Sequence, residues 1–201
     1  MNPSGSAPSP GWQAAHHRLQ DLLRRLSFRD REGAELGQDE AFERWRAMTE
    51  LLRCAAGTIY LVGNGASASM ASHFAADLAK NAQLHTEVFS DLALITAIAN
   101  DLGYDRVFAE PLLRRARPGD MLVAISSSGA STNVLGAARV ARDHGMTLFT
   151  LSAMAPANPL RGLGDLNAYV AAATYGEAET CHAAILHHWM DLVGVDGPAT
   201  R

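Results

Sequence analysis

The chain has 201 residues, of which 48% are hydrophobic, and its formal net charge is -4 at pH 7. This length and composition suit one well-buried domain, and the negative charge excludes a global attraction to nucleic acid or to an anionic membrane. No stretch reaches the roughly 18 apolar residues of a membrane-spanning helix, and the N-terminus lacks the order of a signal peptide. We therefore expect a soluble, cytoplasmic protein with no nucleic-acid or membrane partner.

The first part of the chain is predicted to be a tail followed by two helices. Residues 1–11 are rich in Pro, Ser and Gly, so we expect them to be disordered. Leucines at spacings of three and four predict a helix from Trp12 to Leu26. A polar link from Arg29 to Gln38 leads to a second amphipathic helix from Asp39 to Ala55. Residues 12–56 are therefore assigned as N-terminal helices, the first of which is expected to pack on a partner subunit.

Residues 57–195 are predicted to form an α/β domain, because short apolar runs alternate with helical patterns. The predicted strands are Ile59–Val62, Thr86–Ser90, Met121–Ile125, Met146–Leu151 and Ala168–Ala172. Helices are predicted from the end of the first strand to Lys80 and at Leu92–Asn100, Arg106–Arg115, Thr132–His144 and Glu177–Val193. This alternation favours a parallel sheet joined by right-handed crossovers, and the whole chain is interpreted as a single domain.

Two cysteines, Cys54 and Cys181, lie far apart in the sequence and form no metal-binding or redox motif. Their number and spacing fit a reducing compartment. Both are interpreted as small buried side chains.

Two turns that lead from a strand into a helix are suited to binding an anion. The first contains Asn64, Gly65, Ala66 and Ser67, and the second runs from Ser126 to Ser131. Backbone N–H groups at a helix N-terminus favour an anion, and ligands of open α/β folds collect at this edge of the sheet. The first turn is not a dinucleotide fingerprint, because Ala68 stands where the third glycine would fall.

The second turn adds the neutral hydroxyl donors of Ser126, Ser128 and Ser131. Neutral donors suit a phosphate that must bind and leave without a large ionic contribution. An ordinary serine-rich turn with a helix cap is the alternative for this segment alone. Two such turns after core strands favour a phosphate site.

Histidine and carboxylate side chains form a second group of candidate residues. His73 and Asp77 stand four apart on one helical face, and the last helix carries Glu179, His182, His187 and His188. Imidazole and carboxylate groups suit zinc or a similar divalent ion, and they equally suit acid–base catalysis near neutral pH. For each histidine taken alone, an ordinary core or surface side chain is the favoured interpretation. Glu179 and His187 are about 12 Å apart along a regular helix, so one ion reaches both only with an unusual geometry or with two subunits.

The segments GNGAS, HFAADL, AIAND, ISSSGASTNV and E-x-x-H-x-x-x-x-H occur in this order in the chain. With them the sequence resembles the sedoheptulose-7-phosphate (phosphoheptose) isomerases of the sugar isomerase (SIS) fold, from about Phe42 to Val193. The resemblance implies a flavodoxin-like three-layer sandwich with a mostly parallel five-stranded sheet. It also implies a homotetramer with active sites between subunits, and usually a zinc ion.

Site residues follow from the resemblance by position. Asp77 and His187 would be the acid–base pair, and the metal ligands would be His73, Asp77, Glu179 and His187. The substrate would be held by Asn64, Gly65, Ala66, Ser67, Asp77, Asn100, Asp101, Ser126, Ser127, Ser128, Ser131 and Glu179. The chain departs from the family in having Asp77 where Glu is usual and Glu179 where Gln is common, which bears on substrate and rate more than on reaction class.

The implied reaction interconverts sedoheptulose 7-phosphate and D-glycero-D-manno-heptose 7-phosphate through an enediol. Two other functions stay open at this point. One is a non-catalytic SIS scaffold that binds the bacterial replication initiator, although such a relative lacks the acid and histidine set. The other is a phosphosugar-sensing SIS protein, although no DNA-binding segment accompanies the domain here.

Overall fold

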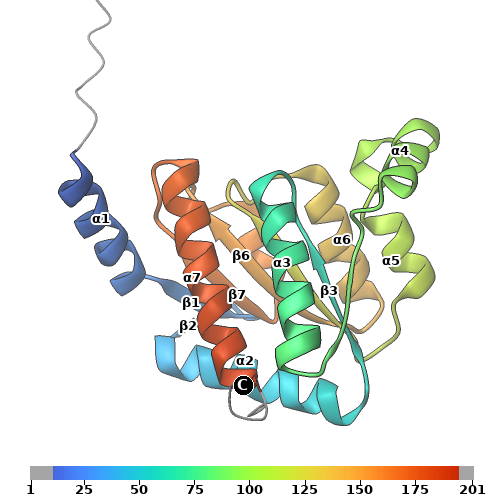
Figure 1. The fold of residues 1–201 in the computed structure, drawn as a ribbon, viewed down its shortest axis with the longest axis horizontal. Helices are drawn as coiled ribbons and strands as arrows, with labels where there is room; N and C mark the ends of the chain where they lie inside the picture. Colours follow the sequence, from blue (N-terminus) through green and yellow to red (C-terminus); the bar gives the residue numbers. More distant parts are fainter. Residues whose placement is uncertain (1–10, 195–201) are drawn as a thin grey trace, which may run out of the picture.

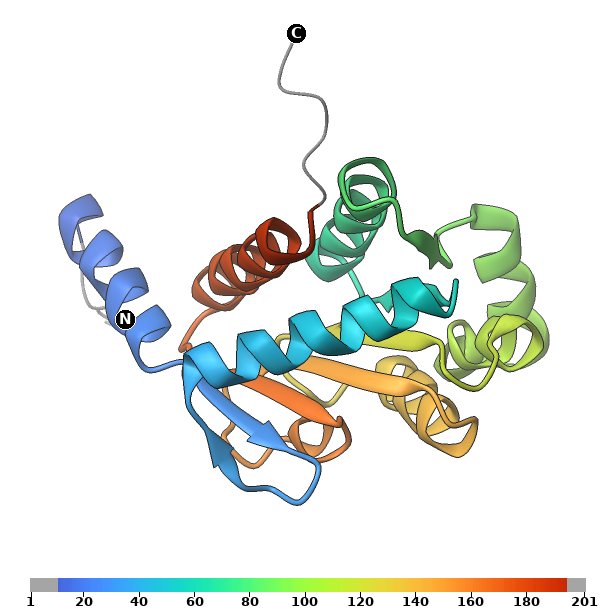
Figure 2. The same ribbon diagram turned by 90° about the horizontal axis from the view of Figure 1, so that it is seen from below.

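The structure is a computed structural model, and it describes residues 11–194 (Figures 1 and 2). The predicted disordered tail, residues 1–11, lies outside the described residues except for Gly11, and so does residue 195 of the predicted domain. None of the helices within residues 11–194 combines the length and the apolar character needed to cross a membrane.

Five parallel strands form the body of the sheet, as the sequence predicts. Their order is β4-β3-β5-β6-β7, which is the flavodoxin-like arrangement in which the first strand of the unit lies between the second and the third. The strands are β3 (Thr58–Val62), β4 (His85–Val88), β5 (Met121–Ser126), β6 (Thr147–Ala153) and β7 (Leu166–Val170). β7 begins two residues before the predicted Ala168.

The predicted count of five strands is wrong, because the sheet has seven strands within residues 11–194. The polar link after the first helix contains a hairpin of β1 (Ser27–Asp30) and β2 (Glu35–Leu36). β1 pairs antiparallel with β7, with Phe28 opposite Ala168, and so extends the sheet (Figure 2). Phe28 is fully buried, while the polar residues around it hid the strand from a search for apolar runs.

Helices cover both faces of the sheet, which gives three layers (Figure 1). The α-helices are α1 (Trp12–Arg24), α2 (Gln38–Cys54), α3 (Ala66–Asn81), α4 (Leu92–Asp101), α5 (Ala109–Arg115), α6 (Thr132–Asp143) and α7 (Tyr175–Val193). Two short 3-10 helices, η1 (Tyr104–Arg106) and η2 (Pro159–Gly162), complete the set. α1 projects from the side of the body next to α7.

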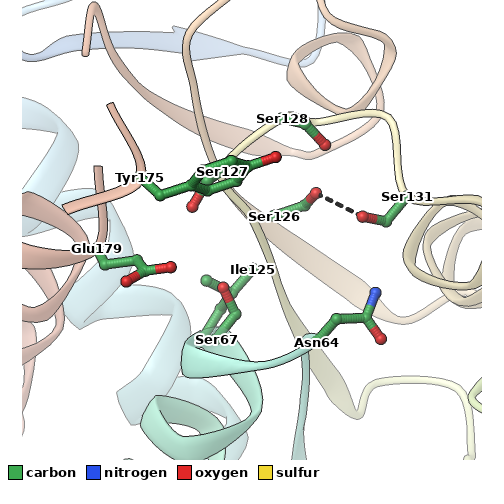
Figure 3. A pocket seen from close by; sticks show the side chains of 9 residues that line it. All are labelled: Asn64, Ser67, Ile125, Ser126, Ser127, Ser128, Ser131, Tyr175 and Glu179. Atoms are coloured by element: carbon green, nitrogen blue, oxygen red, sulfur yellow. Dashed lines mark hydrogen bonds between the residues drawn. The ribbon is translucent and has the colours of Figure 1, made fainter. Parts of the chain in front are cut away.

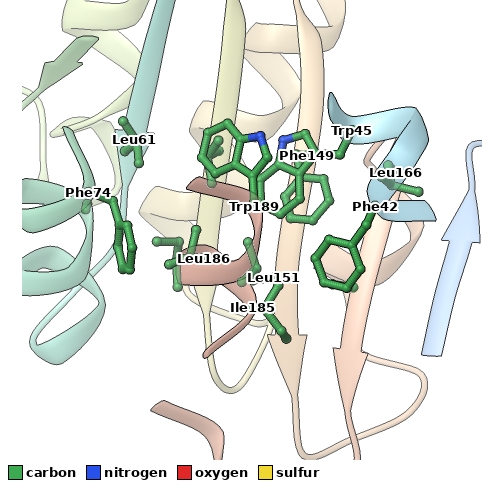
Figure 4. Close-up of a cluster of buried hydrophobic side chains, with 14 of the residues drawn as sticks. Phe42, Trp45, Leu61, Phe74, Phe149, Leu151, Leu166, Ile185, Leu186 and Trp189 are labelled. Atoms are coloured by element: carbon green, nitrogen blue, oxygen red, sulfur yellow. The ribbon is translucent and has the colours of Figure 1, made fainter. Parts of the chain in front are cut away.

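The two faces have separate cores because the side chains of β5 alternate between them. Val123 packs with the cluster under α2, α3 and α7, whereas Leu122 packs with the cluster under α5 and α6. The first cluster contains Trp45 of α2 and Trp189 of α7, whose rings stack on each other (Figure 4). Trp45 also stacks on Phe149 of β6, so these contacts hold α7 against α2 and the sheet. Several candidate site residues lie on α7.

The two cysteines differ in their surroundings. Cys181 is fully buried on α7, as expected, and burial, followed by the charge of Glu177, raises the pKa of its thiol to about 11. The prediction that Cys54 is buried is wrong, because it lies exposed at the end of α2.

Candidate functional site

The two predicted anion turns meet at a cavity of about 190 Å³ at the carboxyl edge of the sheet (Figure 3). Seven predicted site residues line it: Asn64, Ser67, Ser126, Ser127, Ser128, Ser131 and Glu179. Ile125 and Tyr175 complete the lining. The sequence therefore located both strand-to-helix turns, and the parallel register of β3 and β5 brings them together.

The first turn is held close to the start of α3. A Cβ atom at Gly63 would lie 2.6 Å from the Cβ of Ser67, so a larger residue there would push the helix away. Gly65 has a φ of 57°, in the left-handed region that glycine adopts readily. Gly65 and Ala66 do not line the cavity, and their predicted contact with substrate stays a prediction.

The second turn, residues 126–131, is called the serine turn here. The hydroxyl groups of Ser126 and Ser131 lie 3.2 Å apart, within hydrogen-bond distance, and Ser128 accepts a hydrogen bond from the backbone N–H of Ala130 (Figure 3). Gly129 has a φ of 63°, which closes the turn. The arrangement presents neutral donors around a small space, as binding of a phosphoryl group requires.

The opposite wall of the cavity is the first part of α7. A capping box starts this helix, in which the Thr174 side chain accepts from the backbone N–H of Glu177 and the Glu177 carboxylate accepts from the backbone N–H of Thr174. The fixed helix start places Tyr175 and Glu179 on the cavity. Glu179 is the one carboxylate among the lining residues, so it is the group that could hold a cation or a proton beside a bound sugar.

His73, Asp77 and His187 lie together, but they do not line this cavity. His73 Nε2 is 3.5 Å from an Asp77 carboxylate oxygen, and the rings of His73 and His187 are 5.6 Å apart between centroids. Asp77 also lies 3.7 Å from the ammonium of Lys80. The packing of α3 on α7 thus gathers three predicted residues into one patch, which we call the histidine patch.

Glu179 does not join the histidine patch. It precedes His187 by eight residues on α7, which separates the two by about 12 Å along the helix. Within residues 11–194 no three side chains of His, Cys, Asp or Glu converge to hold a metal ion. The donor chemistry suits zinc, but the geometry of a single chain does not assemble the four predicted ligands.

Asn100 and Asp101 lie at the end of α4 and also do not line the cavity. The Asn100 amide donates to the Asp101 carboxylate over 2.8 Å, and both side chains are exposed. Tyr104, a little further along, connects this region to the site, since its hydroxyl donates to the side-chain oxygen Oδ1 of Asn64 over 3.1 Å.

Sequence reasoning missed several residues that shape the site. Tyr175 lines the cavity, and the helix-start pattern at Thr174 could have placed it there. Asn133 is buried on α6 and pairs with Asn64, while Asn158 packs against Gly129 of the serine turn. No motif in the sequence marks either asparagine, because their importance comes from contacts between distant segments.

His182 was grouped with the candidate ligands, but it is a core residue. It is fully buried, and its Nε2 lies 3.3 Å from the carbonyl oxygen of Ser152 on β6. Burial is the main cause that lowers the pKa of His182, to about 4, so the ring is neutral at physiological pH. His188 lies exposed on another side of α7 than His187, with its ring against Phe42.

Comparisons with known proteins agree with the fold. The SIS domain model matches residues 44–153, which is more than half of the chain. The chain is 35% identical to a phosphoheptose isomerase of Streptomyces coelicolor over 161 residues, covering 77% of this chain and 69% of the relative. It is 37% identical over 139 residues to a phosphoheptose isomerase of Mycobacterium bovis, covering 66% of this chain and 70% of the relative.

A solved structure is also similar. The phosphoheptose isomerase GmhA from Neisseria gonorrhoeae superposes with a TM-score of 0.78 at 26% sequence identity. The superposition covers 90% of this chain and 96% of that protein.

Proposed function

This chain belongs to the phosphoheptose isomerase family of SIS-domain proteins, and on that premise we propose that it is an aldose–ketose isomerase that acts on a phosphosugar. The observation that carries the proposal is the cavity where the first turn, the serine turn and Glu179 meet. Neutral donors at one wall suit a phosphoryl group, and a carboxylate at the other wall suits the polar part of a sugar.

The finer proposal is that the substrates are sedoheptulose 7-phosphate and D-glycero-D-manno-heptose 7-phosphate. The serine turn would hold the phosphate, and this remote binding would orient the carbonyl end of the sugar. A base then removes the proton from the carbon next to the carbonyl, an enediol forms, and an acid returns a proton to the neighbouring carbon. Asp77 and His187 are the proposed acid–base pair.

The position of that pair supports a shared active site. Asp77 and His187 belong to the histidine patch, away from the lining of their own cavity. We propose that the protein works as a homotetramer, in which a second copy brings its histidine patch toward the serine turn. The exposed faces of His73 and His187 leave room for such an approach.

The proposal includes a zinc ion bound at the histidine patch. His73, Asp77 and His187 would be its ligands in one chain, with Glu179 joining if assembly brings a copy of it near. A bound divalent ion would stabilise the enediolate oxygen by its charge. Metal analysis of the purified protein tests this point separately from turnover.

The direct test is turnover of sedoheptulose 7-phosphate by the purified full chain and by two neighbouring variants. His187→Ala is expected to abolish turnover without loss of folding, whereas His188→Ala, which changes an exposed histidine on another side of the helix, is expected to retain it. Undiminished activity of His187→Ala would remove the assignment of His187. A wild-type chain that binds the phosphosugar but does not turn it over would favour the scaffold or the sensor instead.

A mixing experiment tests whether active sites are shared. One inactive variant would carry Ser126→Ala and Ser128→Ala, and the other would carry His187→Ala. If two copies complete each site, subunit exchange between the variants restores part of the activity, because some hybrid sites contain both intact halves. Activity that stays absent in exchanged hybrids would place both halves of the site in one chain.

A further inference from the structure

A second polar cavity lies at the far end of the sheet from β4, between the β1–β2 hairpin and η2. Its volume is about 220 Å³, and it shares no lining residue with the cavity at the serine turn. Three arginines, Arg29, Arg31 and Arg161, line it together with Asp30 and Asn158. We call it the arginine cavity.

Arg161 is the unusual member of this group, because it is a buried cation without a hydrogen-bonded carboxylate. The residue is only 7% exposed, and its guanidinium lies over the ring of Tyr169. Nη1 donates to the carbonyl oxygen of Pro156 and Nη2 donates to the hydroxyl of Ser27, both of which are neutral acceptors. Its Nε is buried and has no hydrogen-bond partner among the described residues, 11–194. A buried charge in this state is costly, so an anion that paired with it would be favoured.

The nearby carboxylates are engaged elsewhere. Glu35 lies 3.7 Å from Arg161, too far for a hydrogen bond, and it already accepts from Ser27 and from Nε of Arg29. Asp30 accepts from the backbone N–H groups of the hairpin turn. The carboxylate of Asp165 lies 3.4 Å from Nε of Arg31.

The electrostatics of the cavity also favour an anion. Burial and the neighbouring charge of Arg29 lower the pKa of Arg161, which means that its positive charge is disfavoured by its surroundings. Arg29 contacts the carboxylate of Glu35 through Nε, and Arg31 contacts that of Asp165 through Nε. The other N–H groups of these two guanidinium groups are not used in those contacts. Planar guanidinium groups bind phosphoryl oxygens with paired hydrogen bonds, which suits a small cavity lined by three of them.

The arginine cavity is connected to the serine turn through Asn158. The side-chain oxygen Oδ1 of Asn158 accepts a hydrogen bond from the backbone N–H of Arg161, and the Asn158 side chain occupies the space where Gly129 has no side chain. The backbone N–H of Leu160 donates to the carbonyl oxygen of Gly129. A ligand that moved η2 would therefore also move the serine turn.

We propose that the arginine cavity binds the phosphoryl group of a small molecule at a site separate from the serine turn. Occupancy of the arginine cavity is transmitted to the serine turn through Asn158 and Leu160. The proposal concerns binding at β1 and η2 and does not depend on the isomerase reaction.

Inorganic phosphate is the probe for the test, with calorimetric titration of the full chain at constant ionic strength. Because phosphate also suits the serine turn, the titration uses the Ser126→Ala, Ser128→Ala variant as the background. Phosphate is expected to bind this background, and Arg31→Gln added to it is expected to weaken binding about tenfold, since one charge-assisted contact is lost. Arg44→Gln, an exposed arginine on α2 that pairs with Glu40, is the matched control and leaves binding unchanged.

Arg161→Lys keeps the charge but removes the planar fork, so it is also expected to weaken binding. Arg31 is half exposed, which keeps the test valid if the buried Arg161 variant does not fold. In NMR spectra of the backbone amides of the Ser126→Ala, Ser128→Ala variant, phosphate should shift the signals of Gly33 and Gly162, which line the cavity. No binding to the background, or binding that neither arginine variant weakens, would overturn the proposal.

Discussion

Asn64 and Asn133 face each other with their side-chain amides paired. The Nδ2 of Asn64 donates to Oδ1 of Asn133 over 2.9 Å, and the Nδ2 of Asn133 donates to Oδ1 of Asn64 over 2.8 Å. Asn64 belongs to the first turn, and Asn133 lies in the first turn of α6, directly after the serine turn. The pair therefore fixes the distance between the first turn and the serine turn, although only Asn64 lines the cavity.

Replacing Asn133 with alanine should weaken substrate binding, although Asn133 does not line the cavity. The buried Asn133 amide would be lost, and Asn64 would be free to turn away from the cavity, so we expect KM for the phosphosugar to rise. We also expect a loss of about 1–3 kcal/mol in the free energy of unfolding. Asn81→Ala, an exposed asparagine at the end of α3, is the control for steady-state kinetics and denaturant unfolding. Equal KM values for the two variants would contradict the positioning role.

Gly129→Ala should disrupt the serine turn by two separable effects. The left-handed backbone costs an alanine about 1–2 kcal/mol, and a Cβ at this position would lie 1.9 Å from Oδ1 of Asn158. Displacing the buried Asn158 from its partners adds about 1–3 kcal/mol.

Gly119→Ala is the matched control for Gly129→Ala. Gly119 has a φ of 90°, but nothing lies within 4 Å of a Cβ placed there, so this variant reports backbone strain alone. Denaturant unfolding should show a clearly larger loss for Gly129→Ala, and this variant should also bind the phosphosugar more weakly than Gly119→Ala does. Equal losses in the two variants would mean that Asn158 moves aside without cost.

Burial of His182 predicts a loss of stability on mild acidification. Its pKa is about 4 in the folded protein and about 6.5 in the unfolded chain, so the unfolded chain takes up a proton first. The contribution of His182 is therefore complete above about pH 6.5 and falls toward pH 4, by at most about 1.4 kcal/mol per pH unit and about 3 kcal/mol in total.

Urea unfolding between pH 4.5 and pH 7 would measure this dependence. His182→Gln should flatten it, whereas His85→Gln, which changes an exposed histidine, should leave the slope as it is in the wild type. An unchanged slope in His182→Gln would show that other groups cause the acid sensitivity.

The two stacked tryptophans of the core should respond differently to the same substitution. Trp189 Nε1 donates to the hydroxyl of Thr49 over 3.0 Å, whereas the buried Nε1 of Trp45 has no hydrogen-bond partner in the part of the chain that the structure describes. Both changes to phenylalanine remove a similar volume, but Trp45→Phe also removes an unsatisfied polar group. We therefore expect Trp45→Phe to cost about 1–3 kcal/mol less than Trp189→Phe in thermal or urea unfolding. The reverse order would contradict this account.

Local patterns in the sequence predicted most of the parallel sheet and both turns of the cavity. The apolar run at β5 and the helix after it could be recognised without any partner, and the parallel register then placed Ser126 beside Asn64. Composition and spacing predict these elements because each βα unit contains its own apolar strand run and its own helical pattern.

The features that the sequence did not predict depend on contacts between distant segments. β1 is a strand because it pairs with β7, and its one buried aromatic, Phe28, is too weak a local signal. His182 looked like its neighbours Glu179 and His187, and only the packing of α7 shows that it faces the core. Asp77 and His187 lie away from the cavity. The spacing of Asp77 from His73 and of His187 from Glu179 along their helices could not predict this position.

The pairing of β1 with β7 also has a consequence for how the chain folds. β1 is synthesised early, but its partner strand β7 is among the last to be synthesised. The hairpin can therefore pair with the sheet only after the strands between them in the sequence have been made. Until then, β7 would present an open edge along which another chain could add a strand. A chain that lost residues before α2 would keep that edge exposed permanently and would be prone to aggregation.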